Sequence, residues 1–382
     1  MDYVTQRRHA VVRDLKADGV DAVLITNPVN VTYLTGFTGS SGYLVLTPKA
    51  TVLVSDGRYE EQIREECPGL DVHIRPHDKT TPEAAGEVLT KAGAKNVGFE
   101  SHHATFALAE SLKAAAPKAT FAPLPGRVEA LRAIKDPSEH QHIREAIKVA
   151  EKSFNMFKVL IRETDTEKDM ADSLDHYLRR SGARRAAFDI IVAVGDRGAL
   201  PHATPTTRQL GDGSKLLVDW GADLGYKSDI TRTLRSPYGS APTRRNKNER
   251  SMYEFEELHA IVCQAQDAAA AACRHGALAK DVDAAARKVF ANARLRANKS
   301  QDPGLNAFFT HGLGHGLGLE IHEAPRIRAN SDDVLQAGMV ITLEPGLYIP
   351  EWGGVRVEDD FLVTKDGVIR MTTLPRDAAA IG

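Results

Sequence analysis

The sequence lacks several features that would assign a class of protein at once. It contains three cysteines in 382 residues, Cys67, Cys263 and Cys273. Three scattered cysteines cannot build a disulfide framework or a zinc finger, and they are simplest to place in a reducing compartment. No stretch approaches the ~18 apolar residues that a membrane span needs. The first residues also lack the apolar core of a secretory signal. We therefore expect a cytoplasmic protein with no membrane partner.

An excess of charge of one sign is also missing. The chain has 49 Lys and Arg against 51 Asp and Glu, for a net charge of −2 and a pI of about 6.7. Such a chain has no broad basic field, so nucleic acid is not an expected partner. The hydrophobic fraction of 42% and the charged fraction of 26% are ordinary for a globular protein. The length favours about two or three domains.

The common catalytic motifs are absent as well. The sequence contains no GxxxxGK[ST] phosphate loop, no GxGxxG and no GxSxG. The pair His322-Glu323 does not continue into HExxH, because Ala324, Pro325 and Arg326 follow it. Proline would also interrupt the helix on which that zinc motif depends. These absences exclude the usual signatures of nucleotide binding, serine hydrolysis and helical zinc peptidases.

The arrangement of segments predicts two domains. Residues 1–125 alternate between strand-like and helix-like stretches, which predicts an α/β domain. Prolines then cluster between residues 117 and 137, and we place the domain boundary there. Residues 126–382 predict an α+β domain with a mainly antiparallel, curved sheet. Its expected helices begin at residues 137, 165, 252 and 281, and its expected strands cover 189–194, 215–220, 226–234, 339–344 and 355–363.

The segment Ser236–Arg250 is polar, basic and interrupted by proline and glycine. A solvated loop is the simplest interpretation of this composition. A substrate lid and a dimer contact are sharper interpretations of the same residues.

Acidic residues occur inside or at the ends of apolar strands. Asp219 follows Leu216-Leu217-Val218, and Asp229 lies ten residues later. A hairpin through the intervening turn would bring the two carboxylates side by side. Buried like charges repel one another unless a cation lies between them. Each acid taken alone is more often a turn residue, so the pair matters more than either member.

Three histidines fall within twelve positions of a glycine-rich run, at His311, His315 and His322. A single histidine is usually a hydrogen-bonded core or loop residue, but the grouping favours a site. Glu344 then ends the apolar strand 339–343, and Arg356 and Glu358 share one face of the next strand. Oxygen-rich ligation with one imidazole suits Mn²⁺ first, and Co²⁺ or Zn²⁺ after it. The acids would balance two divalent ions better than one.

Seven fragments now resemble a known family in order and spacing. They are YLTGFTGSSG (Tyr33–Gly42), SDGRYEEQ (Ser55–Gln62), LRAIKDPSEHQHIREA (Leu131–Ala146), ALPHATPT, VDWGADLGYKSDITRT, HGLGHGLGLEIHE and EPGLYIPEWGGVRVED. Over essentially the whole chain they are similar to the creatinase/prolidase/aminopeptidase P group of pita-bread metallopeptidases.

The resemblance implies roles for named residues. Asp219 would bind one divalent ion, Asp229 and Glu358 would bridge two ions, and His315 and Glu344 would bind the second. The resemblance also implies catalytic or substrate contacts for His202, His311, His322, Glu344 and Arg356.

The same resemblance implies a homodimer that acts on small peptides with proline in the second position. We expect an Xaa-Pro aminopeptidase, with an Xaa-Pro dipeptidase as the alternative. A metal-free C–N hydrolase and a non-catalytic peptide-binding relative share the fold. Both predict the loss of ligands, yet all five ligand positions hold metal-binding residues. Arg326, next to Pro325, is expected to tolerate substitution better than Arg356.

Overall fold

The computed structural model describes residues 2–13, 15–238, 254–293 and 304–377. Contacts divide the chain into two units, Met1–Arg132 and Ala133–Gly382. The boundary expected after residue 125 precedes this division and lies just before helix α6 (Arg127–Ala133). Most of the polar segment 236–250 lies outside the described residues, so its predicted role is not addressed by the structure.

The first unit is a six-stranded mixed sheet with the order β4-β3-β2-β1-β5-β6. Its strands are β1 (Ala22–Ile25), β2 (Tyr43–Leu46), β3 (Thr51–Asp56), β4 (Asp71–Arg75), β5 (Asn96–Phe99) and β6 (Thr120–Pro123). Its other helices are α1 (Tyr3–Arg13), α2 (Pro28–Thr35), α3 (Glu60–Glu66), α4 (Thr81–Lys91) and α5 (Phe106–Ala115), with a short 3₁₀ turn η1 (Gly57–Tyr59). The alternating pattern thus produces the α/β unit that the sequence predicts.

Helix α2 begins where the sequence predicts only the end of a strand. The side chain of Asn27 accepts a hydrogen bond from the amide of Val29, and Pro28 occupies the first helical turn. An asparagine cap followed by proline starts a helix as readily as it ends a strand. The same two residues therefore carry both signals, and the second was missed.

The second unit begins with a half built on helices α7 (Pro137–Leu160) and α8 (Glu167–Arg180). The side chain of Asp136 caps α7, and Glu139 completes the capping box. Both helices pack on the antiparallel sheet β11-β9-β8, formed by β8 (Ile191–Val194), β9 (Lys215–Trp220) and β11 (Ile230–Arg235). Two short strands, β7 (Arg185–Ala186) and β10 (Ala222–Asp223), form a separate pair. Short 3₁₀ turns lie at η2 (Gly195–Ala199) and η3 (Leu210–Asp212).

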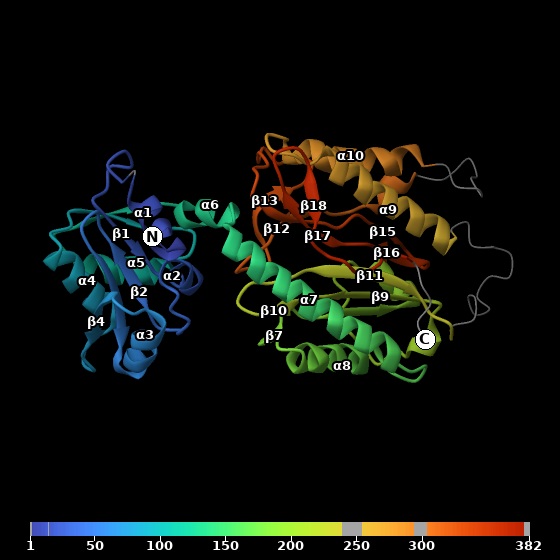
Figure 1. Cartoon of the computed structure of the whole chain (residues 1–382), viewed down its shortest axis with the longest axis horizontal. Coiled ribbons are helices and arrows are strands. Elements are labelled where there is room, and N and C mark those ends of the chain that lie inside the picture. Colours follow the sequence, from blue (N-terminus) through green and yellow to red (C-terminus); the bar gives the residue numbers. More distant parts are fainter. Residues whose placement is uncertain (1, 14, 239–253, 294–303, 378–382) are drawn as a thin grey trace. The chain divides into compact units, whose positions relative to one another are not determined.

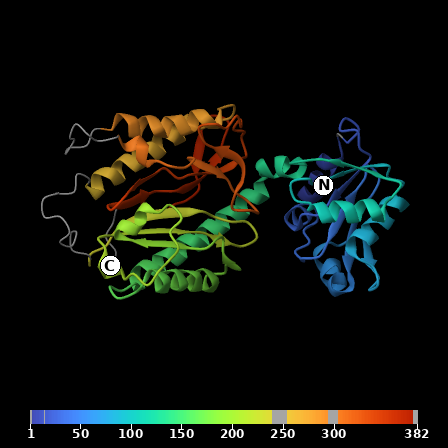
Figure 2. The ribbon, with the colours of Figure 1, turned by 180° about the vertical axis from the view of Figure 1, so that it is seen from behind.

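The remaining half of this unit is built on helices α9 (Phe255–Ala272) and α10 (Ala279–Asn292). They share one core with the later strands, and Figures 1 and 2 show them on the opposite side of the strands from α7 and α8. The strands are β12 (Gly314–Gly316), β13 (Glu323–Ile327), β14 (Val340–Leu343), β15 (Gly346–Ile349), β16 (Gly353–Arg356), β17 (Asp359–Val363) and β18 (Val368–Arg370), preceded by a 3₁₀ turn η4 (Leu305–Phe308).

The two halves of the second unit meet at Glu358. The sequence predicts one strand over residues 355–363, but the structure breaks it into β16, which pairs with β15, and β17, which pairs with β14. Between them Glu358 forms a bridge with Thr231 of β11. A strand that changes partners cannot be recognised from its alternation alone, because the alternation continues through the break.

The predicted fold class is confirmed as an α/β unit followed by an α+β unit whose sheets are mainly antiparallel. Within the described residues, no helix is both long enough and apolar enough to cross a membrane.

Arg232 of β11 offers a test of how the second unit is held together. Its guanidinium is 1% exposed and donates to the carbonyl of Glu358 at 2.6 Å and to Asp359 Oδ1 at 2.7 Å. Arg232→Met should lower the free energy of unfolding by about 3–5 kcal/mol, because Asp359 stays buried without its partner. Arg235→Met on the same strand is the control, since its partner Glu256 is exposed and the pair is worth at most ~1 kcal/mol. Urea unfolding measures both, and equal losses would contradict the prediction.

Candidate active site

Sheet β11-β9-β8 supplies the first two acids of the site. Asp219 lies in β9 directly opposite Thr231 of β11, and Asp229 immediately precedes β11. Both carboxylates are buried, and burial together with the nearby charge of Asp219 raises the pKa of Asp229. The antiparallel pair thus places the two acids near each other. The chain between them is more than a simple turn, because β10 occupies part of it.

The other half of the unit supplies three more residues. His315 lies in β12, Glu344 directly follows β14, and Glu358 directly precedes β17. His315 Nε2 is 3.6 Å from Asp229 Oδ2 and 3.6 Å from Glu344 Oε1. One ligand atom from each of Asp229, His315 and Glu358 lies within 4.8 Å of the others. Residues about 130 positions apart therefore form a group that could hold a metal ion.

Arg356 connects Asp219 to this group. Its guanidinium donates to Asp219 Oδ2 at 2.7 Å and to the hydroxyl of Thr231 at 3.0 Å. The Thr231 hydroxyl in turn donates to Glu358 Oε2 at 2.6 Å. Asp219 Oδ1 is buried and has no hydrogen-bond partner. A buried carboxylate oxygen without a partner is costly, so this atom is available to a ligand.

Burial and mutual repulsion disfavour the charged form of these acids. Burial raises the pKa of Asp229 and of Glu344 well above the ordinary range, and the charge of Glu358 adds to both shifts. Burial and Asp219 raise the pKa of Glu358 to about 8. The pKa of Asp219 is also raised by burial, although Arg356 opposes that shift. The cluster therefore lacks positive charge.

The imidazole of His315 does not supply positive charge to this cluster either. Burial and the neighbouring His322 lower the pKa of His315 to about 3, so the ring is neutral near pH 7. Its Nδ1 lies 3.1 Å from the carbonyl of Gly316, which can only accept, so Nδ1 carries the proton. The lone pair of Nε2 then faces two carboxylates. Acceptors that face acceptors in a buried site fit a cation between them.

The remaining predicted residues surround this group. His322 lies with its ring centroid 4.4 Å from that of His315. His202 is exposed in the loop after β8, where it directly follows Pro201. Arg356 donates to the carbonyl of the adjacent Pro201 at 3.3 Å. All the predicted site residues thus belong to one region of the second unit.

Tyr348 was missed by the reasoning from sequence. Its hydroxyl accepts from Arg356 at 2.8 Å and lies 2.7 Å from His311 Nε2, whose Nδ1 is 2.7 Å from the carbonyl of Gly312. Burial raises the pKa of Tyr348 to about 12, so the hydroxyl keeps its proton and donates a hydrogen bond to His311. The period-two spacing from Glu344 through Gly346 to Tyr348 was the available signal.

Asp360 was missed too. It is fully buried, its Oδ2 accepts from the amide of Asp229 at 3.2 Å, and its Oδ1 has no partner. It lies two residues beyond Glu358 in the chain. The same spacing could have indicated it.

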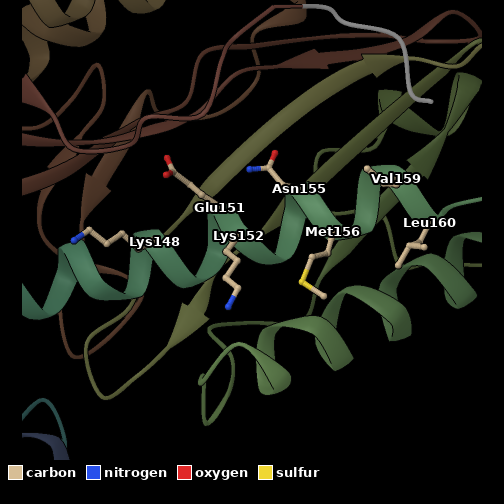
Figure 3. A pocket seen from close by; sticks show the side chains of 7 residues that line it. All are labelled: Lys148, Glu151, Lys152, Asn155, Met156, Val159 and Leu160. Carbon is tan, nitrogen blue, oxygen red and sulfur yellow. The ribbon is translucent and has the colours of Figure 1, made fainter.

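A cavity elsewhere in the unit is not part of this region. It has a volume of about 680 Å³ and lies along α7 (Figure 3). It is lined by Lys148, Glu151, Lys152, Asn155, Met156, Val159 and Leu160, and none of these is a predicted site residue. Glu151 instead accepts from the amide of Leu374 at 2.8 Å and holds the C-terminal segment.

Residues 141–365 match metallopeptidase family M24, and residues 7–134 match the creatinase/prolidase N-terminal domain. The chain belongs to metallopeptidase family M24. The resemblance inferred from the sequence fragments is therefore confirmed, and the second unit is the pita-bread domain of that family. The residues that could hold a metal thus belong to a hydrolase of peptide bonds.

Relatives of this M24 peptidase are similar over almost their whole length. An Xaa-Pro dipeptidase of Pyrococcus furiosus is 33% identical over 97% of this chain and 99% of its own. The structure of an Xaa-Pro dipeptidase from Bacillus anthracis has a TM-score of 0.87 at 32% identity, covering 99% of both chains. That of an X-Pro aminopeptidase from Thermotoga maritima has a TM-score of 0.85 at 30% identity, covering 98% of this chain and 100% of its own. Proteins named dipeptidase and proteins named aminopeptidase thus both occur among its relatives.

Protons and cations should compete for this site. Glu358 has a pKa raised from 4.5 to about 8, so the stability that its proton contributes is present below about pH 4.5 and is lost as the pH rises toward 8. A bound divalent ion replaces that proton. The gain in Tm between chelator and saturating Mn²⁺ should therefore be roughly 5 °C larger at pH 8 than at pH 5. Thermal unfolding at both pH values checks this, and an equal gain would contradict it.

Proposed function

We propose that this M24 peptidase is an exopeptidase that hydrolyses the bond between an N-terminal residue and proline. Asp219, Asp229, His315, Glu344 and Glu358 would hold two divalent ions. The observation that carries the proposal is the buried group in which the lone pair of a neutral His315 faces Asp229 and Glu344. Mn²⁺ fits this oxygen-rich set first, and Co²⁺ or Zn²⁺ after it. When bound, such ions lower the pKa of water and stabilise negative charge on a carbonyl oxygen.

Glu344 is the acid best placed to move a proton. Its side chain is 19% exposed, more than those of Asp229 at 7% and Asp219 at 12%, so it is the acid most open to substrate. As a carboxylate it could accept a proton from water and hold it. The nitrogen of an Xaa-Pro bond carries no hydrogen and must be protonated as the bond breaks. Glu344 would deliver that proton.

The residues around the acids would bind and orient the peptide. His311 keeps its Nε2 fixed against Tyr348, and its Nδ1 lies 3.9 Å from Glu344 Oε2. His322 and His202 lie at the edge of the group with exposed side chains, where they would donate hydrogen bonds to the substrate carbonyl. Arg356 would orient Asp219 and hold the shape of the pocket through Tyr348.

Substrate length is the finer part of the proposal. Arg326 of β13 is the direct cross-strand partner of His315 and is exposed. Burial lowers the pKa of His322 most, and the charge of Arg326 lowers it further. The same charge lowers the pKa of Glu344, so Arg326 lies close to the site. In an Xaa-Pro dipeptide a free carboxylate adjoins the proline, whereas a longer peptide has a neutral amide there. An exposed guanidinium at this position favours the dipeptide. The Xaa-Pro aminopeptidase expected from the sequence is the second candidate.

A metal-free C–N hydrolase and a non-catalytic peptide-binding module are both disfavoured by the buried acids. Neither activity requires metal ligands, so neither would have a use for carboxylates that repel one another inside the protein. A homodimer and a cytoplasmic location remain part of the proposal, and gel filtration with light scattering tests the first.

Removal of the proton acceptor should abolish turnover. Glu344→Gln keeps the size of the side chain but cannot take a proton, so kcat should fall by about 10³-fold or more. Excess chelator should remove activity, and added Mn²⁺ should restore it. Kinetics on an Xaa-Pro dipeptide and an Xaa-Pro-Yaa tripeptide measure these effects. Full activity of Glu344→Gln with metal present would overturn the role of this residue.

The two arginines should respond differently to substitution. Arg326→Gln should raise KM for an Xaa-Pro dipeptide about 10- to 100-fold and leave a tripeptide nearly unchanged, because only the dipeptide presents a carboxylate. Arg356→Gln should impair both substrates, because the buried Asp219 loses its partner. A loss for Arg326→Gln that is equal on both peptides would support the aminopeptidase instead.

A further inference from the structure

Helix α10 makes contacts with the chain around His311 that the proposed chemistry does not use. Asp283 on this helix is completely buried, and Arg287 lies one turn later. Arg287 Nε donates to Asp283 Oδ2 at 2.6 Å, and its Nη2 lies 3.3 Å from Oδ1. The two side chains form a bidentate pair, which fixes the plane of the guanidinium.

This pair forms hydrogen bonds with the main chain of segment 309–313 at three residues. Arg287 Nη1 donates to the carbonyl of Phe309 at 3.2 Å, and Nη2 donates to the carbonyl of His311 at 2.7 Å. Asp283 Oδ1 accepts from the amide of Leu313 at 3.2 Å. The guanidinium carbon also lies 4.4 Å from the centre of the Phe309 ring. The contacts are therefore made before, at and after His311.

Regular structure holds this segment only at its end, where the amide of Glu344 donates to the carbonyl of Leu313 at 2.8 Å. The 3₁₀ turn η4 ends at Phe308, and β12 begins only at Gly314. Gly312 allows little movement toward β13, because an added Cβ would lie 3.1 Å from the carbonyl of Ile327. Helix α10 itself is anchored through Ala286 and Phe290 in the core of this half. A rigid helix thus sets the position of a short irregular segment.

The side chain at the centre of this segment reaches the site. The ring of His311 is tied to Tyr348 at 2.7 Å and approaches Glu344 at 3.9 Å. Its orientation depends on where its main chain lies, because the ring has only two rotatable bonds. A shift of the backbone would move Nε2 off Tyr348 and change the space next to Glu344.

We propose that Arg287 is a positioning residue that sets where His311 meets the substrate, acting through the main-chain carbonyls of Phe309 and His311. The proposal rests on the proposed contact between His311 and the peptide. Lysine cannot replace the arginine fully, since one ammonium cannot present two donors in a plane and also hold both oxygens of Asp283.

A double-mutant cycle tests this route. Arg287→Ala should lower kcat/KM for an Xaa-Pro substrate about 10- to 100-fold, and Arg287→Lys should lose less. In a His311→Ala background, adding Arg287→Ala should lower kcat/KM by less than about a further threefold, because the group that Arg287 positions is gone. A merely structural role would instead give losses that multiply. Multiplied losses would overturn the proposal, as would an unchanged kcat/KM in Arg287→Ala.

Lys280→Ala is the matched control on the same helix. Lys280 pairs with Asp332 at 2.7 Å on the surface, and both side chains are exposed. This variant should keep kcat/KM within about twofold of the parent protein. A loss as large as that of Arg287→Ala would show that any ion pair on α10 matters equally, and it would overturn the specific role of Arg287.

Amide hydrogen exchange provides a readout that does not depend on catalysis. In Arg287→Lys, which keeps the charge beside Asp283, peptides covering residues 309–313 should exchange faster, while those covering β14 and β9 should not change. Unchanged exchange at 309–313 would show that Arg287 does not hold this segment, and it would overturn the proposal even if activity falls. If the parent protein cleaves no Xaa-Pro peptide, the proposed function fails, and the exchange result still decides whether Arg287 holds this segment.

Discussion

The burial of several carboxylates around one neutral imidazole is the constraint on which the second unit depends. Asp229 and Glu358 are buried and Glu344 is nearly so. Burial and neighbouring acids, Glu358 and Asp219 among them, raise their pKa values, and the lone pair of His315 adds a further acceptor. Without a cation this arrangement opposes folding, because the acids must either lose their hydration as charged groups or stay protonated. The surrounding strands and helices must therefore supply enough stability to hold the acids together before any ion binds.

That stability comes from two halves with separate cores. One half packs α7 and α8 on the sheet that carries Asp219 and Asp229. The other packs α9 and α10 on the strands that carry His315 and Glu344. The bridge between Thr231 and Glu358 is where the strands of the two halves meet, and the acids converge there. A site at such a seam draws its ligands from rigid strands, which keeps repelling groups from moving apart.

Loops that carry histidines are held from outside the site by other carboxylates. Glu167 of α8 is fully buried and accepts from the amides of Val194 and Thr206 and from Arg197, so it joins the two ends of the loop that contains His202. Asp283 and Arg287 do the same for His311. In both cases a helix-borne acid accepts hydrogen bonds from backbone amides of an irregular segment between regular elements.

Much of this could be inferred from the chain alone, because local patterns depend on neighbours in sequence. Apolar runs that lead into acids indicated β9 and β14, and Pro137 with Ser138 indicated the start of α7. The ordered fragments indicated the family and the residues that could hold metal. The partner exchange at Glu358, the hydroxyl of Tyr348 between His311 and Arg356, and the contacts of Arg287 were not accessible in this way. They depend on the three-dimensional approach of segments far apart in the chain, and alternation along a strand contains no information about which distant segment will lie beside it.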